Sequence, residues 1–228
     1  MKKADYLKGI GYEFLQDDAV YKVNTDTVSL GLFLDPMIHK CVLDIGTNTG
    51  ALLLYAFHQG AGKLIGVDIH EDALKIAKQN LSRYTEDFFL IHQRIQDVQI
   101  DPVDVILCNP PFFEMNNVTE DDYFREAMFQ ESLPPEELFL SFRRLLKDNG
   151  EIYLIYQADR FPELYELCLK YRMKIMKMQY VHDISSPHAL RVLLKLKIGK
   201  MSKLKVKRPL LLHAGEILNY EKTLKDLY

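Results

Sequence analysis

The sequence predicts an α/β fold with a doubly wound, mostly parallel β-sheet. Between residues 41 and 108, short apolar runs alternate with amphipathic segments of helical period, as strand–helix–strand units with right-handed crossovers do. Near the C-terminal end, two longer apolar runs are joined by a Ser-Ser-Pro turn, which indicates an antiparallel strand pair added to the parallel sheet.

The expected strands are the apolar runs 41–45, 64–68, 88–92, 103–108, 152–156, 175–181 and 189–198. The expected helices are the periodic segments 28–34, 51–57, 71–81, 134–146, 161–171 and 219–228. Residues 12–23 indicate a hairpin or an extended segment. The acidic stretch 113–135 is too long for an ordinary connection, so we expect it to be functional or disordered. One domain is expected over residues 1–228.

Composition and charge exclude several protein classes. The net charge of −3 indicates no nucleic-acid partner by itself. Cys41, Cys108 and Cys168 are far apart and match no metal-binding spacing, so we expect no metal and a reducing, cytoplasmic environment. Neither a signal peptide nor an apolar run long enough to span a membrane is present, and we expect no membrane partner.

A glycine-rich turn, Gly46-Thr47-Asn48-Thr49-Gly50, follows the first expected strand. Glycine allows the backbone to turn tightly and to approach a ligand, and the next helix offers free N–H groups at its start. Asp68 ends the second strand, where a carboxylate can accept both hydroxyls of a ribose. Asp44 leads the turn, and its negative charge disfavours a pyrophosphate and favours a cationic or amine-bearing ligand. Asn48 occupies a glycine-like position and tolerates a left-handed backbone.

The tetrapeptide Asn109-Pro110-Pro111-Phe112 follows the fourth expected strand. The prolines end the strand and stiffen the loop, because they lack an N–H donor and their φ is fixed. The Asn109 carboxamide and the Pro110 carbonyl supply two acceptors beside the Phe112 ring, which suits a planar molecule that bears an NH₂ group. A proline turn that only closes the strand is the alternative.

These two motifs resemble those of the class I methyltransferases that use S-adenosyl-L-methionine (SAM), a family with a Rossmann-like fold. The glycine turn is similar to motif I, with Asn48 as a departure, and the tetrapeptide resembles motif IV of the amine methyltransferases. The resemblance implies that Asn109 and Pro110 hold the acceptor amine beside the methyl group while Phe112 stacks on the base. The acceptors of such enzymes are adenine N6, cytosine N4, guanine N2 or glutamine N5.

Positive charge is concentrated near the C-terminal end. Twelve basic residues and a single acid, Asp183, lie between Lys170 and Arg208. This distribution fits a phosphate backbone. Exposed edge strands that lysines protect from aggregation are the alternative, and the period-two Lys203, Lys205 and Lys207 fit both interpretations.

From Asp18 onward the chain resembles the bacterial tRNA adenine-N6 methyltransferases that modify position 37 of a valine tRNA. Besides the tetrapeptide, the segments that carry this resemblance are Tyr21–Gly31, Arg125–Ala127, His188–Leu194 and Asn219–Glu221. It implies a SAM-binding half over 41–112, a basic half over 136–228, an N-terminal segment, 1–40, that packs over SAM, and a substrate loop over 113–135. The cofactor residues expected from it are Lys22, Thr25, Asp26, Asp44, Gly46, Asn48, Gly50, Asp68, Ile69, Gln96, Asp97 and Asn109. The expected substrate residues are Phe112, Arg125, Arg191, Lys203, Lys205 and Lys207.

Three alternatives stay open at this point. A guanine-N2 rRNA methyltransferase carries the same tetrapeptide, and so does a glutamine-N5 methyltransferase of release factors, which has a helical domain ahead of motif I that 43 residues cannot form. A non-catalytic RNA-binding module need not keep Asp44, Asp68 and Asn109 together. We expect a tRNA-modifying enzyme that acts as a monomer.

Overall fold

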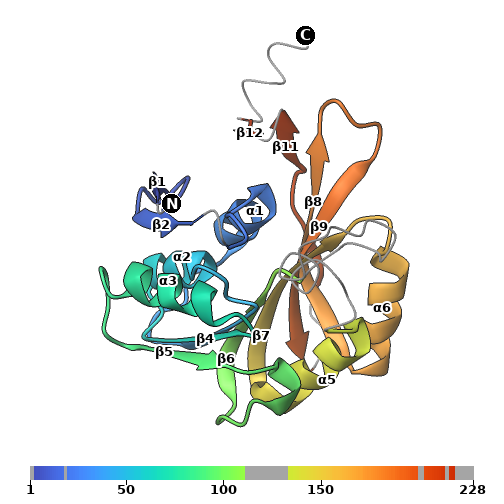
Figure 1. Ribbon diagram of the computed structural model, residues 1–228. Helices are drawn as coiled ribbons and strands as arrows, with labels where there is room; N and C mark the ends of the chain where they lie inside the picture. The colour runs from blue at the N-terminus through green and yellow to red at the C-terminus, as the bar shows by residue number, and fades with distance from the viewer. Residues whose placement is uncertain (1–2, 18–19, 111–132, 200–202, 214–215, 219–228) are drawn as a thin grey trace, which may run out of the picture.

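The computed structural model describes residues 3–17, 20–110, 133–199, 203–213 and 216–218. Within these residues the main sheet has the strand order β12-β11-β8-β9-β7-β6-β3-β4-β5, and β10 pairs with β8. Helices cover both faces: α1, α2 and α3 lie on one side, and α5 and α6 lie on the other (Figure 1). The expected doubly wound fold is confirmed.

The parallel part of the sheet contains five strands. They are β3 (Cys41–Ile45), β4 (Lys63–Asp68), β5 (Phe88–His92), β6 (Val103–Cys108) and β7 (Leu146–Gln157). The chain runs outward from β3 through β4 to β5, then returns to place β6 on the other side of β3. The strand order therefore reverses between β3 and β6, and the carboxyl ends of these two strands form the switch point where open α/β sheets bind ligands.

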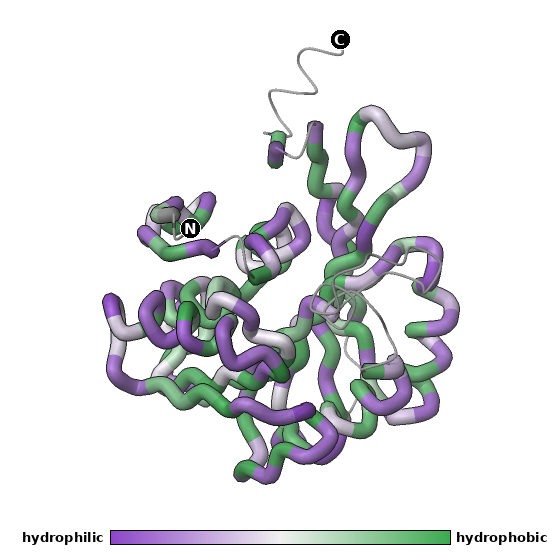
Figure 2. Tube along the Cα trace, in the orientation of Figure 1, coloured by the Kyte–Doolittle hydropathy of each residue, from purple (hydrophilic) through white to green (hydrophobic). Residues whose placement is uncertain are grey.

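The connecting helices agree closely with the apolar periodicity. They are α2 (Ala51–His58), α3 (Glu71–Leu81), the short 3₁₀ helix η1 (Ile95–Asp97), α5 (Pro135–Leu145) and α6 (Phe161–Lys170). In α3 and α5 the apolar face is buried and the charged face is exposed, as amphipathic helices on a sheet require. In Figure 2 the apolar colour is concentrated along the central strands.

The C-terminal strands include the expected antiparallel pair. Strand β9 (Ala189–Ile198) lies between β7 and β8 (Met173–Asp183) and runs antiparallel to both. Three short strands that the apolar pattern did not predict lie beyond β8 at this end of the sheet. They are β10 (Lys205–Val206), β11 (Leu210–His213) and β12 (Glu216–Ile217). The helix expected over 219–228 lies outside the described residues.

The N-terminal segment forms a hairpin and a helix. Strands β1 (Lys3–Tyr6) and β2 (Glu13–Gln16) pair with each other, so the expected hairpin starts earlier than the sequence indicated. Helix α1 (Thr25–Phe33) follows and packs against α2, β7 and β9. Asn80 of α3 holds the hairpin: its amide donates to the Leu15 carbonyl at 3.0 Å and to the Thr49 carbonyl at 2.9 Å, and its oxygen accepts from the Leu15 N–H. The hairpin is thus tied to the glycine-rich turn.

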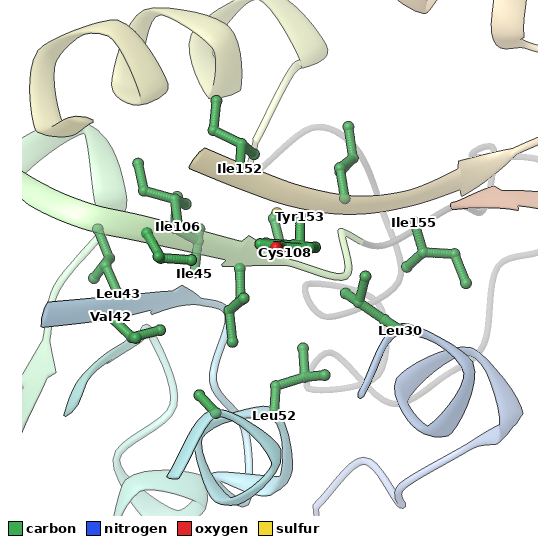
Figure 3. Close-up of a cluster of buried hydrophobic side chains, with 14 of the residues drawn as sticks. Leu30, Val42, Leu43, Ile45, Leu52, Ile106, Cys108, Ile152, Tyr153 and Ile155 are labelled. Carbon is green, nitrogen blue, oxygen red and sulfur yellow. The ribbon is translucent and has the colours of Figure 1, made fainter. Parts of the chain in front are cut away.

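The core lies between the sheet and its two helix layers. Val42, Leu43 and Ile106 on the central strands are fully buried. In Figure 3, Leu43 and Ile106 lie on one face of the sheet, and Leu52 and Leu30 cover its other face from α2 and α1. Burial of each such side chain contributes about 1.5–3 kcal/mol. This core fixes the relative positions of the strand ends. No helix in the described part of the chain is long and apolar enough to cross a membrane.

Candidate active site

A cavity of about 300 Å³ opens at the carboxyl ends of β3, β4 and β6. One wall is the turn after β3, a second is the end of β4, and a third is formed by residues 21–27 of the N-terminal segment. Residues 93–96 close one end, and Asn109 and Pro110 lie at the end of β6. The cavity therefore occupies the switch point of the sheet.

The turn after β3 has the left-handed backbone that its sequence predicts. Gly46, Asn48 and Gly50 have φ values of 72°, 48° and 80°. A Cβ at Gly46 would meet nothing within 4 Å, so its small size leaves room on the cavity side. A Cβ at Gly50 would lie 3.3 Å from the Cβ of Ala77, so Gly50 instead permits the close packing of α2 on α3. Gly46 therefore leaves space beside the cavity, whereas Gly50 allows two helices to pack closely.

Asn48 does more than tolerate its backbone conformation. Its side-chain amide donates a hydrogen bond to the Tyr21 carbonyl, while its backbone N–H donates to Asp68 at 2.7 Å. A glycine here would keep the second bond and lose the first. The departure from the usual motif thus links the turn to the N-terminal segment.

The Asp68 carboxylate lies at the end of β4 and is held by the backbone. One oxygen accepts from the Asn48 N–H and the other accepts from the His70 N–H at 3.0 Å. Burial raises the pKa of Asp68, and these N–H groups oppose the rise. A carboxylate has about four lone-pair sites, so these N–H groups and that of Ile69 leave capacity for a further hydrogen bond from the cavity.

Polar atoms without partners are concentrated in the cavity wall. Both oxygens of Asp44, the hydroxyls of Thr47 and Thr49, and the side-chain oxygen of Asn48 are buried and make no hydrogen bond within the described structure. Buried polar groups are normally satisfied, so such a cluster indicates a ligand that supplies the missing partners. Burial raises the pKa of Asp44 to about 7; the nearby Thr47 hydroxyl opposes this rise, and the charge of Asp68 adds to it. A cationic donor would satisfy this carboxylate best.

Asn109, at the end of β6, is contacted by the wall of the cavity that the N-terminal segment forms. Its side-chain amide donates to the Thr27 hydroxyl at 3.2 Å, and Thr27 belongs to the first turn of α1. The neighbouring Asp26 carboxylate accepts from the Arg191 side chain at 3.0 Å, which joins α1 to β9 across the cavity. Helix α1 thus contacts Asn109 through Thr27 and contacts β9 through the ion pair between Asp26 and Arg191.

Arg144 of α5 supports the end wall of the cavity. Its guanidinium donates to the carbonyls of Ile95 at 2.7 Å and Gln96 at 3.3 Å, and also to the Val98 carbonyl. Three backbone acceptors of η1 and the residue after it are therefore held by one side chain. Gln96 faces the cavity from this supported turn.

The sequence and fold of the chain agree with those of known methyltransferases. A family model described as a methyltransferase domain matches residues 39–208. A protein of Flavobacterium psychrophilum named tRNA1(Val) (adenine(37)-N6)-methyltransferase is 31% identical over 72% of this chain and 74% of its own. The chain belongs to this methyltransferase family.

Two further comparisons agree with this assignment. A Dyadobacter fermentans protein of the same name is 34% identical over 65% of each chain. The crystal structure of the M. jannaschii tRNA m1G37 methyltransferase superposes with a TM-score of 0.66 at 16% identity, covering 88% of this chain and 55% of that one. At that identity the superposition supports the fold alone.

The methyltransferase cavity brings together most of the expected site residues. Those that line it are Asp26, Asp44, Gly46, Asn48, Asp68, Ile69, Gln96, Asn109, Pro110 and Arg191. Four expected cofactor residues are absent from the described lining: Lys22, Thr25, Gly50 and Asp97. Asp97 is exposed at the end of η1, and Gln96 lies on the cavity side in its place. Phe112 and Arg125 fall outside the described residues.

The sequence did not predict several of the residues that line the cavity. Tyr21, Asn24, Thr27, His70 and Leu133 all contribute to the cavity wall. The segment before α1 carried a usable signal, because Asn24 precedes a helix and its side chain accepts from the Thr27 N–H as an N-cap. Its approach to β6 is a tertiary contact that local patterns do not report.

The basic half of the methyltransferase divides into paired and exposed residues. Five of the twelve basic side chains between Lys170 and Arg208 form ion pairs with described acids: Lys170, Lys177, Arg191, Lys195 and Lys197. Although burial acts to raise it, the ammonium groups of Lys177 and Lys195 hold the pKa of Asp35 well below its usual range. We define the lysine row as Lys203, Lys205 and Lys207, which are exposed and make no ion pair among the described residues.

No group of His, Cys, Asp and Glu side chains in the described residues could hold a metal ion. The three cysteines are free thiols. Burial raises the pKa of Cys168 to about 12, so this thiol stays protonated at neutral pH.

Proposed function

We propose that this protein transfers a methyl group from SAM to the exocyclic N6 amine of an adenine in tRNA, at position 37 of tRNA1(Val). The single observation that carries the proposal is that Asn109 and Pro110 line the same cavity as Asp44 and Asp68. A pair of residues suited to the acceptor amine and a pair suited to the cofactor thus line the same cavity. The names of the relatives supply the substrate: a tRNA adenine at position 37.

The cavity residues fit SAM by their chemistry. SAM supplies an electrophilic methyl group on a sulfonium, together with an α-amino group, two ribose hydroxyls and an adenine. The buried and unsatisfied Asp44 carboxylate matches the cationic part of that molecule. The free lone pairs of Asp68 match the ribose hydroxyls, as in other dinucleotide-type folds. Gln96 and Ile69 line the part of the cavity between β4 and η1 that remains for the adenine.

At the other end of the cavity, Asn109 and Pro110 position the acceptor. The lone pair of an aromatic amine is delocalised into its ring, so the amine is a weak nucleophile. Hydrogen bonds from the NH₂ group to the Asn109 oxygen and the Pro110 carbonyl would align the nitrogen and stabilise the positive charge that develops on it. No strong base is needed, because the ammonium product loses its proton readily after transfer.

The target base must leave its stack or be unpaired to reach this cavity. We assign base stacking to Phe112 and phosphate contacts to Arg125 and the lysine row, as the family resemblance implies. Arg191 contributes differently, because its guanidinium already pairs with Asp26 beside the cavity. Because its substrate is tRNA, we expect the protein to act in the cytoplasm.

The test is methyl transfer from tritiated SAM to unmodified tRNA, followed by digestion to nucleosides and mass spectrometry. We expect label in N6-methyladenosine, and removal of adenine 37 from the transcript should abolish it. Asn109→Ala should stop transfer and leave SAM binding nearly unchanged. Label in guanosine or in a peptide would refute the substrate assignment, and loss of SAM binding in the variant would refute the role of Asn109.

A further inference from the structure

A chain of hydrogen bonds leads from the N-cap of α1 to Asn109. The Asn24 side-chain oxygen accepts from the Thr27 N–H at 3.0 Å and from the Thr27 hydroxyl at 3.1 Å. The same Thr27 hydroxyl oxygen lies 3.2 Å from the side-chain nitrogen of Asn109. All three residues line the cavity.

The direction of this chain is set by a backbone group. A backbone N–H can only donate, so the Asn24 atom that faces the Thr27 N–H must be the carbonyl oxygen of its carboxamide. That oxygen also faces the Thr27 hydroxyl, and an amide oxygen can only accept. The single hydroxyl proton of Thr27 is therefore committed to Asn24.

Because its proton is donated to Asn24, the Thr27 hydroxyl can form only one kind of hydrogen bond with Asn109. With its proton donated to Asn24, the hydroxyl has only lone pairs left for Asn109. It can accept from the Asn109 NH₂ group and cannot donate to the Asn109 oxygen. The flipped carboxamide would place two acceptors against each other. The contact thus selects one of the two orientations of the Asn109 side chain.

We propose that Thr27 is a positioning residue that orients the Asn109 carboxamide so that its oxygen accepts from the substrate amine. This inference rests on the proposed methylation of an amine at Asn109. In the flipped orientation Asn109 would present its own NH₂ group to the amine and repel it. The α1 N-cap therefore sets the orientation of the amide that the reaction needs.

The hydrogen bonds of Asn24 also connect the chain from Asn24 to Asn109 with the glycine-rich turn after β3 on the proposed cofactor side of the cavity. The Asn24 NH₂ group donates to the Tyr21 hydroxyl at 3.0 Å, and the Tyr21 carbonyl accepts from the Asn48 side chain in the turn after β3. Residues 21–27 thus contact both the turn after β3 and the side-chain amide of Asn109. A single element aligns the two halves of the cavity.

The test compares Thr27→Val with Thr27→Ser. Valine keeps the shape and the backbone N–H that caps α1, but it cannot accept from Asn109. We expect kcat to fall roughly tenfold or more in Thr27→Val, because a displaced group in a positioned site costs one to two orders of magnitude, while the Kd for SAM stays unchanged. Thr27→Ser keeps the hydroxyl and should restore most of the rate.

Ser29→Ala is the matched control. Ser29 is a buried residue of the same helix, and its hydroxyl makes no hydrogen bond in the described structure, so its loss should leave kcat unchanged. Thr27→Ala serves as a second variant without branched packing, and melting temperatures show whether each protein is folded. The rates are measured with the acceptor that the wild-type protein methylates, so an error in the substrate and an error in the role of Thr27 give different results.

Three outcomes would overturn the inference. The first is a wild-type kcat in both Thr27→Val and Thr27→Ala. The second is a serine variant as slow as the valine variant. The third is a rise in the Kd for SAM that accounts for the lost rate, since the hydroxyl would then act on the cofactor rather than on Asn109.

Discussion

We expect the Asp44 carboxyl to make the proposed binding of SAM depend on pH. Burial raises the pKa of this carboxyl to about 7, so the protein without ligand holds a mixture of neutral and ionised Asp44 near neutral pH. A cationic ligand binds the ionised form. The Kd for SAM should therefore rise as the pH falls, and Asp44→Asn should remove this dependence.

The expected size follows from the ionised fraction. With a pKa of about 7 in the free protein, that fraction falls about tenfold between pH 8 and pH 6, and the apparent Kd rises by the same factor. Asp44→Asn should bind SAM more weakly than the wild type at pH 8. Its Kd should change little across the same range.

The stability of the free protein should change in the opposite direction. The pKa of Asp44 is higher in the folded protein than in the unfolded chain, so the carboxyl's contribution is fully present below the unfolded pKa and is lost as the pH rises through about 7. Going from pH 8 to pH 6, the free energy of unfolding should therefore gain about 1.4 kcal/mol from this group. The Asn variant lacks this gain.

Both quantities can be measured on the same protein. Isothermal titration calorimetry gives the Kd for SAM between pH 6 and pH 8, and urea denaturation without SAM gives the free energy of unfolding. The difference between wild type and Asp44→Asn isolates this carboxyl from the other titrating groups. A wild-type Kd that does not change with pH, or a variant with the wild-type pH profile, would refute the argument.

Three further predictions concern the surroundings of the cavity. Replacing all three lysines of the lysine row by glutamine should lower the slope of log K for tRNA binding against log salt concentration by about two to three, measured by filter binding at several salt concentrations. The ion-paired Lys170→Gln should change this slope little. A triple variant with the wild-type slope would contradict a phosphate contact. Arg144→Met should raise the Kd for SAM roughly tenfold, since three carbonyls lose a charged donor, and calorimetry would contradict this with an unchanged Kd. Asn80→Ala should lower the free energy of unfolding by about 2–3 kcal/mol, and a change below the error of urea denaturation would count against its role in holding the hairpin.

The strands and helices that follow apolar periodicity could be predicted from the sequence. The bounds of β3, β5, β6, α3 and β9 agree with the expected ones, because burial on a sheet imposes a local pattern on each element. The short edge strands β10, β11 and β12 could not be predicted, since a strand of two to four residues at the edge of a sheet needs little apolar pattern.

The candidate site was predicted where a motif reports backbone geometry. Gly46, Asp68 and Asn109 each follow a strand, and parallel strands bring their carboxyl ends to one edge. Arg191 and Lys195 show the limit of that reasoning. Their charge is visible in the sequence, but their partners Asp26 and Asp35 are about 160 residues away, so pairing and exposure could not be separated.

Asn48 shows how a departure from a motif can be explained by a distant contact. Motif I commonly has glycine where this chain has Asn48, and the backbone alone accepts either residue because φ is 48°. The carboxamide adds a bond to the Tyr21 carbonyl, and Tyr21 in turn accepts from Asn24, the cap residue that directs the Thr27 proton. Asn48→Gly should therefore loosen the N-terminal segment without distorting the turn. We expect its largest effect on kcat, through Asn24 and Thr27, and a wild-type kcat in this variant would show that the two walls of the cavity are positioned independently.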